Sequence, residues 1–266
     1  MTLSLTWRTA LVALIVATLQ LAGCATKDEF SGKTAEKLYA DAKEEMEAGG
    51  YDRAIKQLER VEGLAAGSLL AQQAQLDLAY LYWKTAEKAQ ALTTIERFIK
   101  LNPSSPALDY ALFLRGVINF NDDLGLLGSF AGQDLSERDQ RAARDAFQAF
   151  KQLVEQFPNS KYSPDARQRM TYIVNTLAAY EVHVARYYLR RGAYVAAVNR
   201  AQIAVTEFQQ SPSVEEALYI LVQSYDKLEL TALRDDAERV LHQNFPDSRF
   251  PTVGLAAGKR AWWQLW

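Results

Sequence analysis

Few side chains in this sequence could carry out chemistry: one thiol, at Cys24, and two imidazoles, at His183 and His242. A nucleophile needs a base within hydrogen-bonding reach, and these three residues lie far apart in the sequence. Glu181 beside His183 could begin a metal site, but the next helical turn offers Tyr187 in place of a second ligand. The sequence also has no GxSxG or GxxxxGK[ST] motif. It therefore predicts no enzyme, no metal site and no cofactor.

The surroundings of Cys24 favour lipid attachment. Arg8 precedes an apolar run at 11–19, and the residues Leu-Ala-Gly come directly before Cys24. This order is typical of a secretory signal peptide, and the run is too short to span a bilayer, which takes about 20 apolar residues. Leu-Ala-Gly-Cys resembles the lipobox of bacterial lipoproteins, so we expect removal of 1–23 and N-palmitoyl and S-diacylglycerol groups on Cys24. An ordinary signal peptide followed by a chance cysteine is the alternative.

The residue after Cys24 is Ala25, whereas an aspartate there holds lipoproteins at the inner membrane of many Gram-negative bacteria. We therefore expect the lipid anchor in the outer membrane, facing the periplasm, with residues 24–33 as a flexible tether. Once Cys24 carries lipid, the mature chain has no thiol left for a disulfide. Its hydrophobic core must then hold the fold together unaided.

Composition predicts an all-α protein. Glycine and proline are scarce, at 13 and 7 residues of 266, while the strong helix formers Ala, Leu, Gln, Glu, Lys and Arg are abundant. Without residues 1–23 the chain has 29 basic and 32 acidic residues. This balance argues against nucleic acid as a partner. No apolar stretch after Cys24 is long enough to cross a membrane.

Small residues recur twelve positions apart, at Ala42 and Ala54, Ala79 and Ala91, and Ala185 and Ala197. Small side chains let two helices cross closely, and the spacing resembles the tetratricopeptide repeat, a helix pair of about 34 residues. In another copy Gly116 and Ala146 take these positions, with a glycine-containing insertion at 121–139 between them. A last copy is degenerate, with Val222 and Arg234 at the small positions.

We therefore predict an all-α solenoid of about five tetratricopeptide-type helix pairs, about ten helices, over residues 34–250. The N-terminal repeats cover 34–120, and the C-terminal repeats cover 136–250. The inserted loop 121–139 falls in repeat three. We expect a stretched first helix in repeat four, and we expect serines beside prolines to cap helices, including a capping box from Ser213 to Glu216.

Two segments are candidates for binding. The C-terminal tail, 251–266, has three tryptophans in its last five residues, and tryptophan is enriched at interfaces and membrane surfaces. The alternative is a tail that folds back as a cap on the last repeat. The inserted loop is the second candidate, and its alternative is a loop that packs on its own solenoid.

Several segments together match one family, at Gln72–Tyr80, Ile95–Pro103, Asp109-Tyr110, Leu114–Gly116, Asp134–Asp139, Tyr180–Val182, Tyr187-Tyr188 and Arg191–Arg200. These segments resemble the BamD family of outer-membrane protein assembly factors, formerly called ComL. The resemblance covers nearly the whole mature chain. It is more specific than a general repeat pattern, because the insertion falls in the same repeat and its Arg-Asp exit is shared.

The resemblance implies a periplasmic subunit of the β-barrel assembly machinery. In that family the C-terminal repeats dock onto a POTRA domain of the barrel subunit BamA, and the lipoprotein BamC lies along the molecule in some species. Arg200 falls at the family's position for the POTRA contact, where an arginine could bind a partner carboxylate through two hydrogen bonds. The alternative for Arg200 is a solvated charge on a helix surface.

In the same family the N-terminal repeats offer a groove to the C-terminal targeting signal of unfolded outer-membrane proteins. Relatives often have an aromatic, proline-containing turn after the first repeat, and this chain departs from that pattern at 63–70. The remaining aromatic candidates for a groove are Tyr51, Tyr80, Tyr82 and Trp83. A second interpretation is a periplasmic adaptor lipoprotein for peptidoglycan or cell-division enzymes. A lipid-anchored hydrolase would lack its nucleophile and base.

Overall fold

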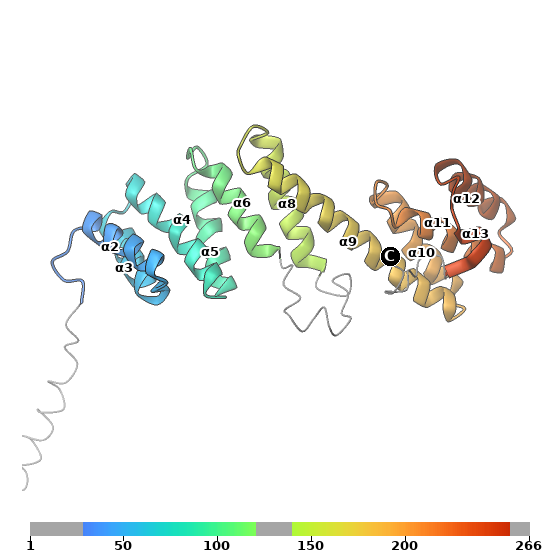
Figure 1. Cartoon of the computed structure of the whole chain (residues 1–266), viewed down its shortest axis with the longest axis horizontal. Coiled ribbons are helices and arrows are strands. Elements are labelled where there is room, and N and C mark those ends of the chain that lie inside the picture. The colour runs from blue at the N-terminus through green and yellow to red at the C-terminus, as the bar shows by residue number, and fades with distance from the viewer. Residues whose placement is uncertain (1–28, 121–139, 256–266) are drawn as a thin grey trace, which may run out of the picture. The chain divides into compact units, whose positions relative to one another are not determined.

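The computed structural model describes residues 29–120 and 140–255, and these contain eleven helices and no strand (Figure 1). They belong to two compact units, one up to Leu81 and one from Tyr82 onward. The predicted signal peptide, Cys24, the insertion 121–139 and the tryptophans of the tail lie outside the described residues. Among the helices that are described, none combines the length and the apolar character needed to span a bilayer.

The first unit contains α2 (Ala35–Ala48), α3 (Tyr51–Leu64) and most of α4 (Leu69–Lys84). Helix α2 begins after Thr34, whose hydroxyl oxygen accepts the backbone N–H of Lys37 at 3.3 Å. It ends at Gly49, where φ is 81°, a left-handed conformation that favours glycine. The turn that follows brings α3 back against α2.

The second unit contains α5 (Lys88–Leu101), α6 (Leu108–Asn119), α8 (Gln140–Gln156), α9 (Ser163–Arg190), α10 (Tyr194–Glu207), α11 (Val214–Lys227), α12 (Thr231–Asn244) and α13 (Phe250–Val253). From α5 to α12 each helix packs on the next one in the sequence, which is the contact pattern of a solenoid. The all-α prediction is confirmed. Within residues 29–120 and 140–255, ten helices follow the chain order of the five predicted pairs, and the short α13 is an addition.

Helix α9 links two hydrophobic cores. It has 28 residues, as the stretched first helix of repeat four predicts. Its first half contributes Ile173 and Leu177 to a core shared with Phe150 of α8. Its second half contributes Ala185 to a core shared with Ala197 of α10. In Figure 1, α9 runs from beside α8 to beside α10.

The small residues of the predicted ladder are buried, as their spacing requires. All the alanines of the ladder are fully buried: Ala42, Ala54, Ala79, Ala91, Ala146, Ala185 and Ala197. At Gly116 of α6 an added Cβ would lie 2.6 Å from Cδ1 of Phe150 in α8, so any larger residue there would force the Phe150 ring to shift. At the degenerate position in the last repeat, Arg234 forms an ion pair with Asp235 at 2.7 Å.

The predicted helix caps are wrong in detail. The hydroxyl of Ser163 donates to the carbonyl oxygen of Phe157 at 2.7 Å and does not cap α9. The side chain of Ser213 makes no cap hydrogen bond at α11. Glu216 is not free to complete a capping box, because its carboxylate binds Arg186 of α9.

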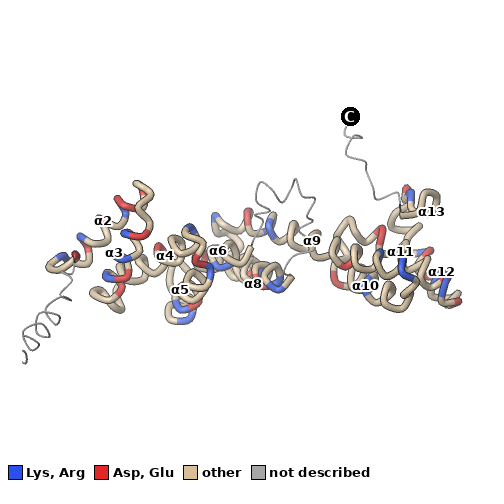
Figure 2. The backbone as a smooth tube through the Cα atoms, turned by 90° about the horizontal axis from the view of Figure 1, so that it is seen from below, with Lys and Arg blue, Asp and Glu red and all other residues tan. Residues whose placement is uncertain are grey.

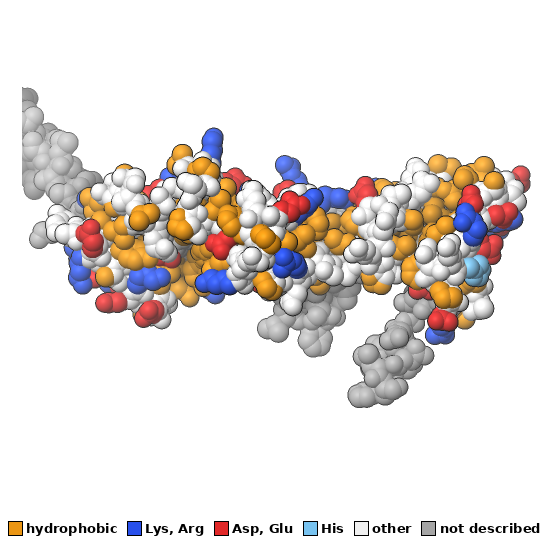
Figure 3. Space-filling model, turned by 90° about the horizontal axis from the view of Figure 1, so that it is seen from above, with side chains coloured by type: hydrophobic (Ala, Val, Ile, Leu, Met, Phe, Trp, Pro, Cys, Tyr) orange, Lys and Arg blue, Asp and Glu red, His pale blue; other side chains and the backbone are white. Residues whose placement is uncertain are grey.

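Charged residues of both signs alternate along the backbone of the helices in each unit (Figure 2). On the face drawn in Figure 3, hydrophobic side chains of the second unit also reach the surface between charged ones. Val195 at the start of α10 is 60% exposed, and Leu233 at the start of α12 is 47% exposed.

Candidate partner-binding site

Arg200, the predicted contact residue, lies on α10 and forms an ion pair within its own helix pair. Its Nη1 donates to Oε2 of Glu181 on α9 at 3.1 Å. The Glu181 side chain is 3% exposed, whereas that of Arg200 is 39% exposed. Arginine carries five N–H donors, and this hydrogen bond uses one of them. The outer part of the guanidinium therefore remains available to solvent or to a partner.

The repeat ladder explains why these two residues meet. Ala185 and Ala197 are the small residues at the crossing of α9 and α10, and both are fully buried. Glu181 comes four residues before Ala185, and Arg200 comes three residues after Ala197. Because the two helices are antiparallel, these steps lead about one turn in the same direction from the crossing. The pair could therefore have been predicted from the ladder.

The surroundings of Arg200 keep it charged. The hydrogen bond to Glu181 raises the pKa of Arg200 above its ordinary value, and burial opposes this effect to a lesser degree. The nearby Tyr180 and Tyr188 of α9 add small contributions in the same direction as Glu181. Both tyrosines are half-buried. The site thus presents a permanent cation beside two aromatic side chains.

A second ion pair ties α9 to α11. Arg186 donates from Nε and Nη2 to the two carboxylate oxygens of Glu216, at 2.6 and 2.7 Å. This is a bidentate arrangement, which is the strongest geometry for an arginine and a carboxylate. Glu216 is buried, so the pair links α9 to α11 inside the repeat array. The guanidinium of Arg186 thus makes two hydrogen bonds within the fold, whereas that of Arg200 makes one.

The first unit has a polar cluster that no motif in the sequence predicts. The hydroxyl of Tyr39 on α2 donates to Oδ2 of Asp77 on α4 at 2.8 Å, and Nζ of Lys43 lies 3.7 Å from the same oxygen. Asp77 is 9% exposed. Burial, followed by the hydrogen bond to Asp77, raises the pKa of Tyr39. Tyr39 and Lys43 are one helical turn apart on α2, which is the signal that could have indicated a shared partner.

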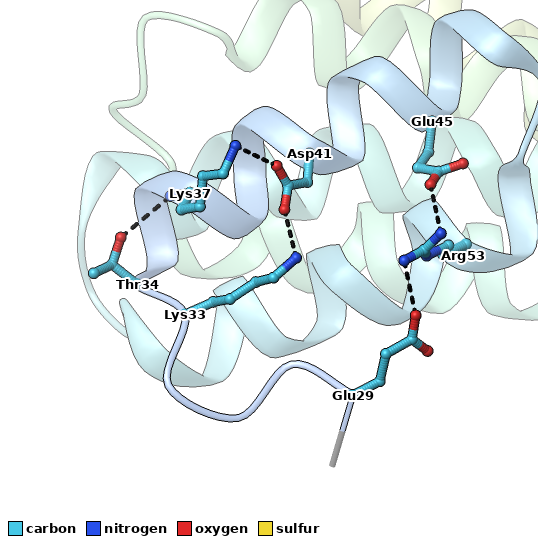
Figure 4. Close-up of polar contacts among 7 residues, drawn as sticks. All are labelled: Glu29, Lys33, Thr34, Lys37, Asp41, Glu45 and Arg53. Atoms are coloured by element: carbon cyan, nitrogen blue, oxygen red, sulfur yellow. Dashed lines mark hydrogen bonds and ion pairs between the residues drawn. The ribbon is translucent and has the colours of Figure 1, made fainter. Parts of the chain in front are cut away.

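The segment before α2 is held against the first repeat by the ion pairs in Figure 4. Lys33 and Lys37 bind the carboxylate of Asp41 at 2.7 and 2.8 Å. Arg53 of α3 binds Glu29 at 2.8 Å and Glu45 of α2 at 3.2 Å. Glu29 and Lys33, inside the range predicted as a tether, therefore contact the first repeat, and residues 24–28 lie outside the described part.

The four aromatic residues predicted for a groove fall in different units. Tyr51 begins α3 and Tyr80 lies in α4, and both belong to the first unit, where they are half-buried. Tyr82 and Trp83 follow at the end of α4 and belong to the second unit. There Nζ of Lys84 lies 5.6 Å from the centre of the Trp83 ring. The structure does not bring the four together within one described unit.

A shallow polar depression of 310 Å³ lies in the second unit, between α5, α6 and α8. It is lined by Leu92, Glu96, Arg115, Asn119, Asp145 and Gln148. Burial lowers the pKa of Arg115, while the charges of Glu96 and Asp145 act in the opposite direction. Nη2 of Arg115 donates to Oε1 of Gln152 at 2.8 Å. The lining thus holds two acidic side chains and one basic one, and the volume is at the lower limit for a ligand pocket.

The described helices do not assemble a metal centre: residues 29–120 and 140–255 contain no group of three His, Cys, Asp or Glu side chains that could hold an ion. His242 on α12 lies 3.9 Å from Oε1 of Glu238, one turn away. His183 is half-buried on α9. The two histidines occupy different helices and share no site in this part of the chain.

Comparison with known proteins gives consistent matches. A family model described as "YfiO: Outer membrane lipoprotein" matches residues 31–241. A protein of Neisseria meningitidis serogroup A is 46% identical over 255 residues, covering 93% of this chain and 96% of its own length. A Neisseria gonorrhoeae protein is 48% identical and covers 87% of this chain and 86% of its own length. A Vibrio cholerae protein is 33% identical, covering 78% and 86%. All three are named "Outer membrane protein assembly factor BamD".

Proposed function

Since this chain belongs to the YfiO family of outer membrane lipoproteins, we propose that it acts in the assembly of outer membrane proteins. Its role is that of a non-catalytic scaffold and receptor in the β-barrel assembly machinery. The names of its relatives support this role. The array of helix pairs is also consistent with it, because such arrays bind partners through extended surfaces.

The protein is tethered to the periplasmic face of the outer membrane through lipid on Cys24. A single acyl chain gives only marginal membrane binding, and stable anchoring takes more than one. A lipoprotein cysteine with N-palmitoyl and S-diacylglycerol groups meets that requirement. Tethering raises the effective concentration of the protein near a membrane-embedded partner. The contacts with that partner can therefore be individually weak.

The face of α9 and α10 around Arg200 docks onto a POTRA domain of a BamA-type barrel subunit. The observation that carries this proposal is the partial exposure of Arg200, 39%, with one N–H committed to Glu181. The remaining donors can bind a carboxylate of the partner through two hydrogen bonds. The half-buried rings of Tyr180 and Tyr188 supply apolar contact area beside the charge.

The first unit serves as the receptor for the targeting signal of unfolded outer-membrane proteins. Tyr51 and Tyr80 are its half-buried aromatic residues among the predicted candidates. The polar cluster of Tyr39, Lys43 and Asp77 joins α2 to α4 through one hydrogen bond and one ion pair, and it adds polar groups suited to an extended peptide. Tyr82 and Trp83 belong to the second unit and are proposed as separate aromatic contacts for the targeting signal. A BamC-type lipoprotein is a further proposed partner.

Variants that test docking must not leave the buried carboxylate of Glu181 without a cation. Arg200→Glu is unsuitable, because it would place a second negative charge beside the buried Glu181. The double variant Glu181→Gln/Arg200→Gln removes both charges together, and Arg200→Lys keeps the charge but loses the planar fork. Each variant carries a C-terminal tag and is recovered from gently solubilised envelopes with its partners.

We expect the wild type to recover a POTRA-containing barrel protein, Arg200→Lys to recover less, and the double variant to recover least. Depletion of the protein should lower the amounts of barrel proteins in the outer membrane. Recovery of peptidoglycan enzymes instead, with septation defects and normal barrel levels on depletion, would refute the assembly role. Equal recovery of the barrel protein by all variants would leave the assembly role standing and refute a contact at Arg200.

A further inference from the structure

Two arginines bind buried carboxylates at α9, and the two pairs differ in the number of hydrogen bonds that join them. Arg186 donates two hydrogen bonds to Glu216, at 2.6 and 2.7 Å, and its side chain is 26% exposed. Arg200 donates a single hydrogen bond to Glu181, at 3.1 Å, and is 39% exposed. The first pair is complete within the fold. The second pair uses one of the five N–H donors of Arg200, while the carboxylate of Glu181 already offsets part of its positive charge.

We propose that Glu181 limits the affinity with which Arg200 binds an acidic side chain of its partner. This inference rests on the proposed docking function of the α9–α10 face. Glu181 is therefore an affinity-setting residue that the partner never touches. It acts through Arg200, by offsetting the charge that the partner's carboxylate would meet.

The physical reason is repulsion between two carboxylates on opposite sides of one guanidinium. An incoming carboxylate is attracted by Arg200 and repelled, from the other side of the guanidinium, by the carboxylate of Glu181. The side chain of Glu181 is 3% exposed, so water and salt screen this repulsion poorly. Glu181 is buried on α9 and bonded to Arg200, so its charge stays close to the guanidinium. The result is a weak contact that dissociates readily.

Glu181→Gln tests the proposal because glutamine keeps the size of the side chain and one oxygen that accepts from Arg200. Only the negative charge is lost. The lipidated protein in detergent is titrated with the purified barrel subunit, and the dissociation constant is measured at low and moderate salt. We expect Glu181→Gln to bind at least about fivefold more tightly than the wild type. Its affinity should also fall more steeply with salt, since the exposed charge is no longer offset.

Glu216→Gln is the matched control. It removes a buried carboxylate from the other arginine pair on α9 without touching Arg200. A general effect of losing a buried charge would appear in both variants, whereas the proposed effect appears only in Glu181→Gln. The gain should also vanish in Glu181→Gln/Arg200→Gln, because it acts through the guanidinium.

Wild type and Glu181→Gln binding with equal affinity and equal salt dependence would overturn this inference and leave the docking function standing. Equal tightening by Glu216→Gln would overturn it too. Failure of both wild type and Glu181→Gln to bind the barrel subunit would instead refute the docking function, and the inference with it. Unfolding curves for each variant establish that the proteins compared are folded.

Discussion

Replacing Gly116 by alanine should destabilise the second unit, because the added methyl group has no room. The new Cβ would lie 2.6 Å from Cδ1 of Phe150, far inside van der Waals contact. Phe150 is fully buried, and its ring packs against Phe113 and Phe120 with centres 6.0 and 6.3 Å away. Overpacking of this kind costs about 1–3 kcal/mol. Alanine recovers about 1 kcal/mol of helix propensity, so the expected net loss is up to about 2 kcal/mol.

Gly63 provides the matched control for this substitution. It lies in α3, and an added Cβ would have no heavy atom within 4 Å. Gly63→Ala should therefore stabilise the protein by up to about 1 kcal/mol. Urea unfolding followed by far-ultraviolet circular dichroism measures both variants. If Gly116→Ala were as stable as Gly63→Ala, the close crossing of α6 and α8 would be refuted. Adding Phe150→Leu to Gly116→Ala should restore part of the loss by making room for the methyl group.

Three further predictions concern polar contacts. Arg186→Gln leaves Glu216 buried without its cation and should lower the free energy of unfolding by about 3 kcal/mol, measured by urea titration. Ser163→Ala removes the hydroxyl that donates to the carbonyl of Phe157 and should cost about 1 kcal/mol in the same assay; no change would refute that hydrogen bond. The ion pairs of Asp41 hold the pKa of its carboxyl below 3.8, so their stabilisation is present at neutral pH and is lost as pH falls through this lowered pKa. Asp41→Asn should therefore narrow the difference in the free energy of unfolding between pH 7 and acidic solution. An unchanged difference would refute this contribution of the Asp41 ion pairs to stability.

The fold was predictable because its main constraint is local and periodic. The alanine pairs mark where two helices cross, and every one of these alanines is fully buried. The same periodicity contains the pair of Glu181 and Arg200, which step in the same direction from the crossing of Ala185 and Ala197. From the sequence alone, Arg200 is a partner contact or a solvated surface charge. Its internal partner could have been deduced by extending the ladder by one turn.

Other features depend on packing that no spacing in the sequence specifies. Arg186 and Glu216 meet 30 residues apart, and their contact depends on how one helix pair rotates against the next. That rotation is decided by the side chains of the core between them. The capping box predicted at Ser213 is wrong for the same reason, since the carboxylate of Glu216 binds Arg186. The groove candidates were chosen by residue type alone, and an aromatic type does not specify which neighbours a side chain meets.

The central claim is that the α9–α10 face around Arg200 contacts a POTRA-containing barrel subunit. The most direct measurement is site-specific photo-crosslinking in cells, with the photoreactive residue at Asn199, which is exposed and next to Arg200. The same residue at the exposed Glu238 of α12 serves as the control position. We predict a crosslink from Asn199 to the barrel subunit, and its loss in the Glu181→Gln/Arg200→Gln background. Absence of this crosslink, or its persistence in the double variant, would contradict the account.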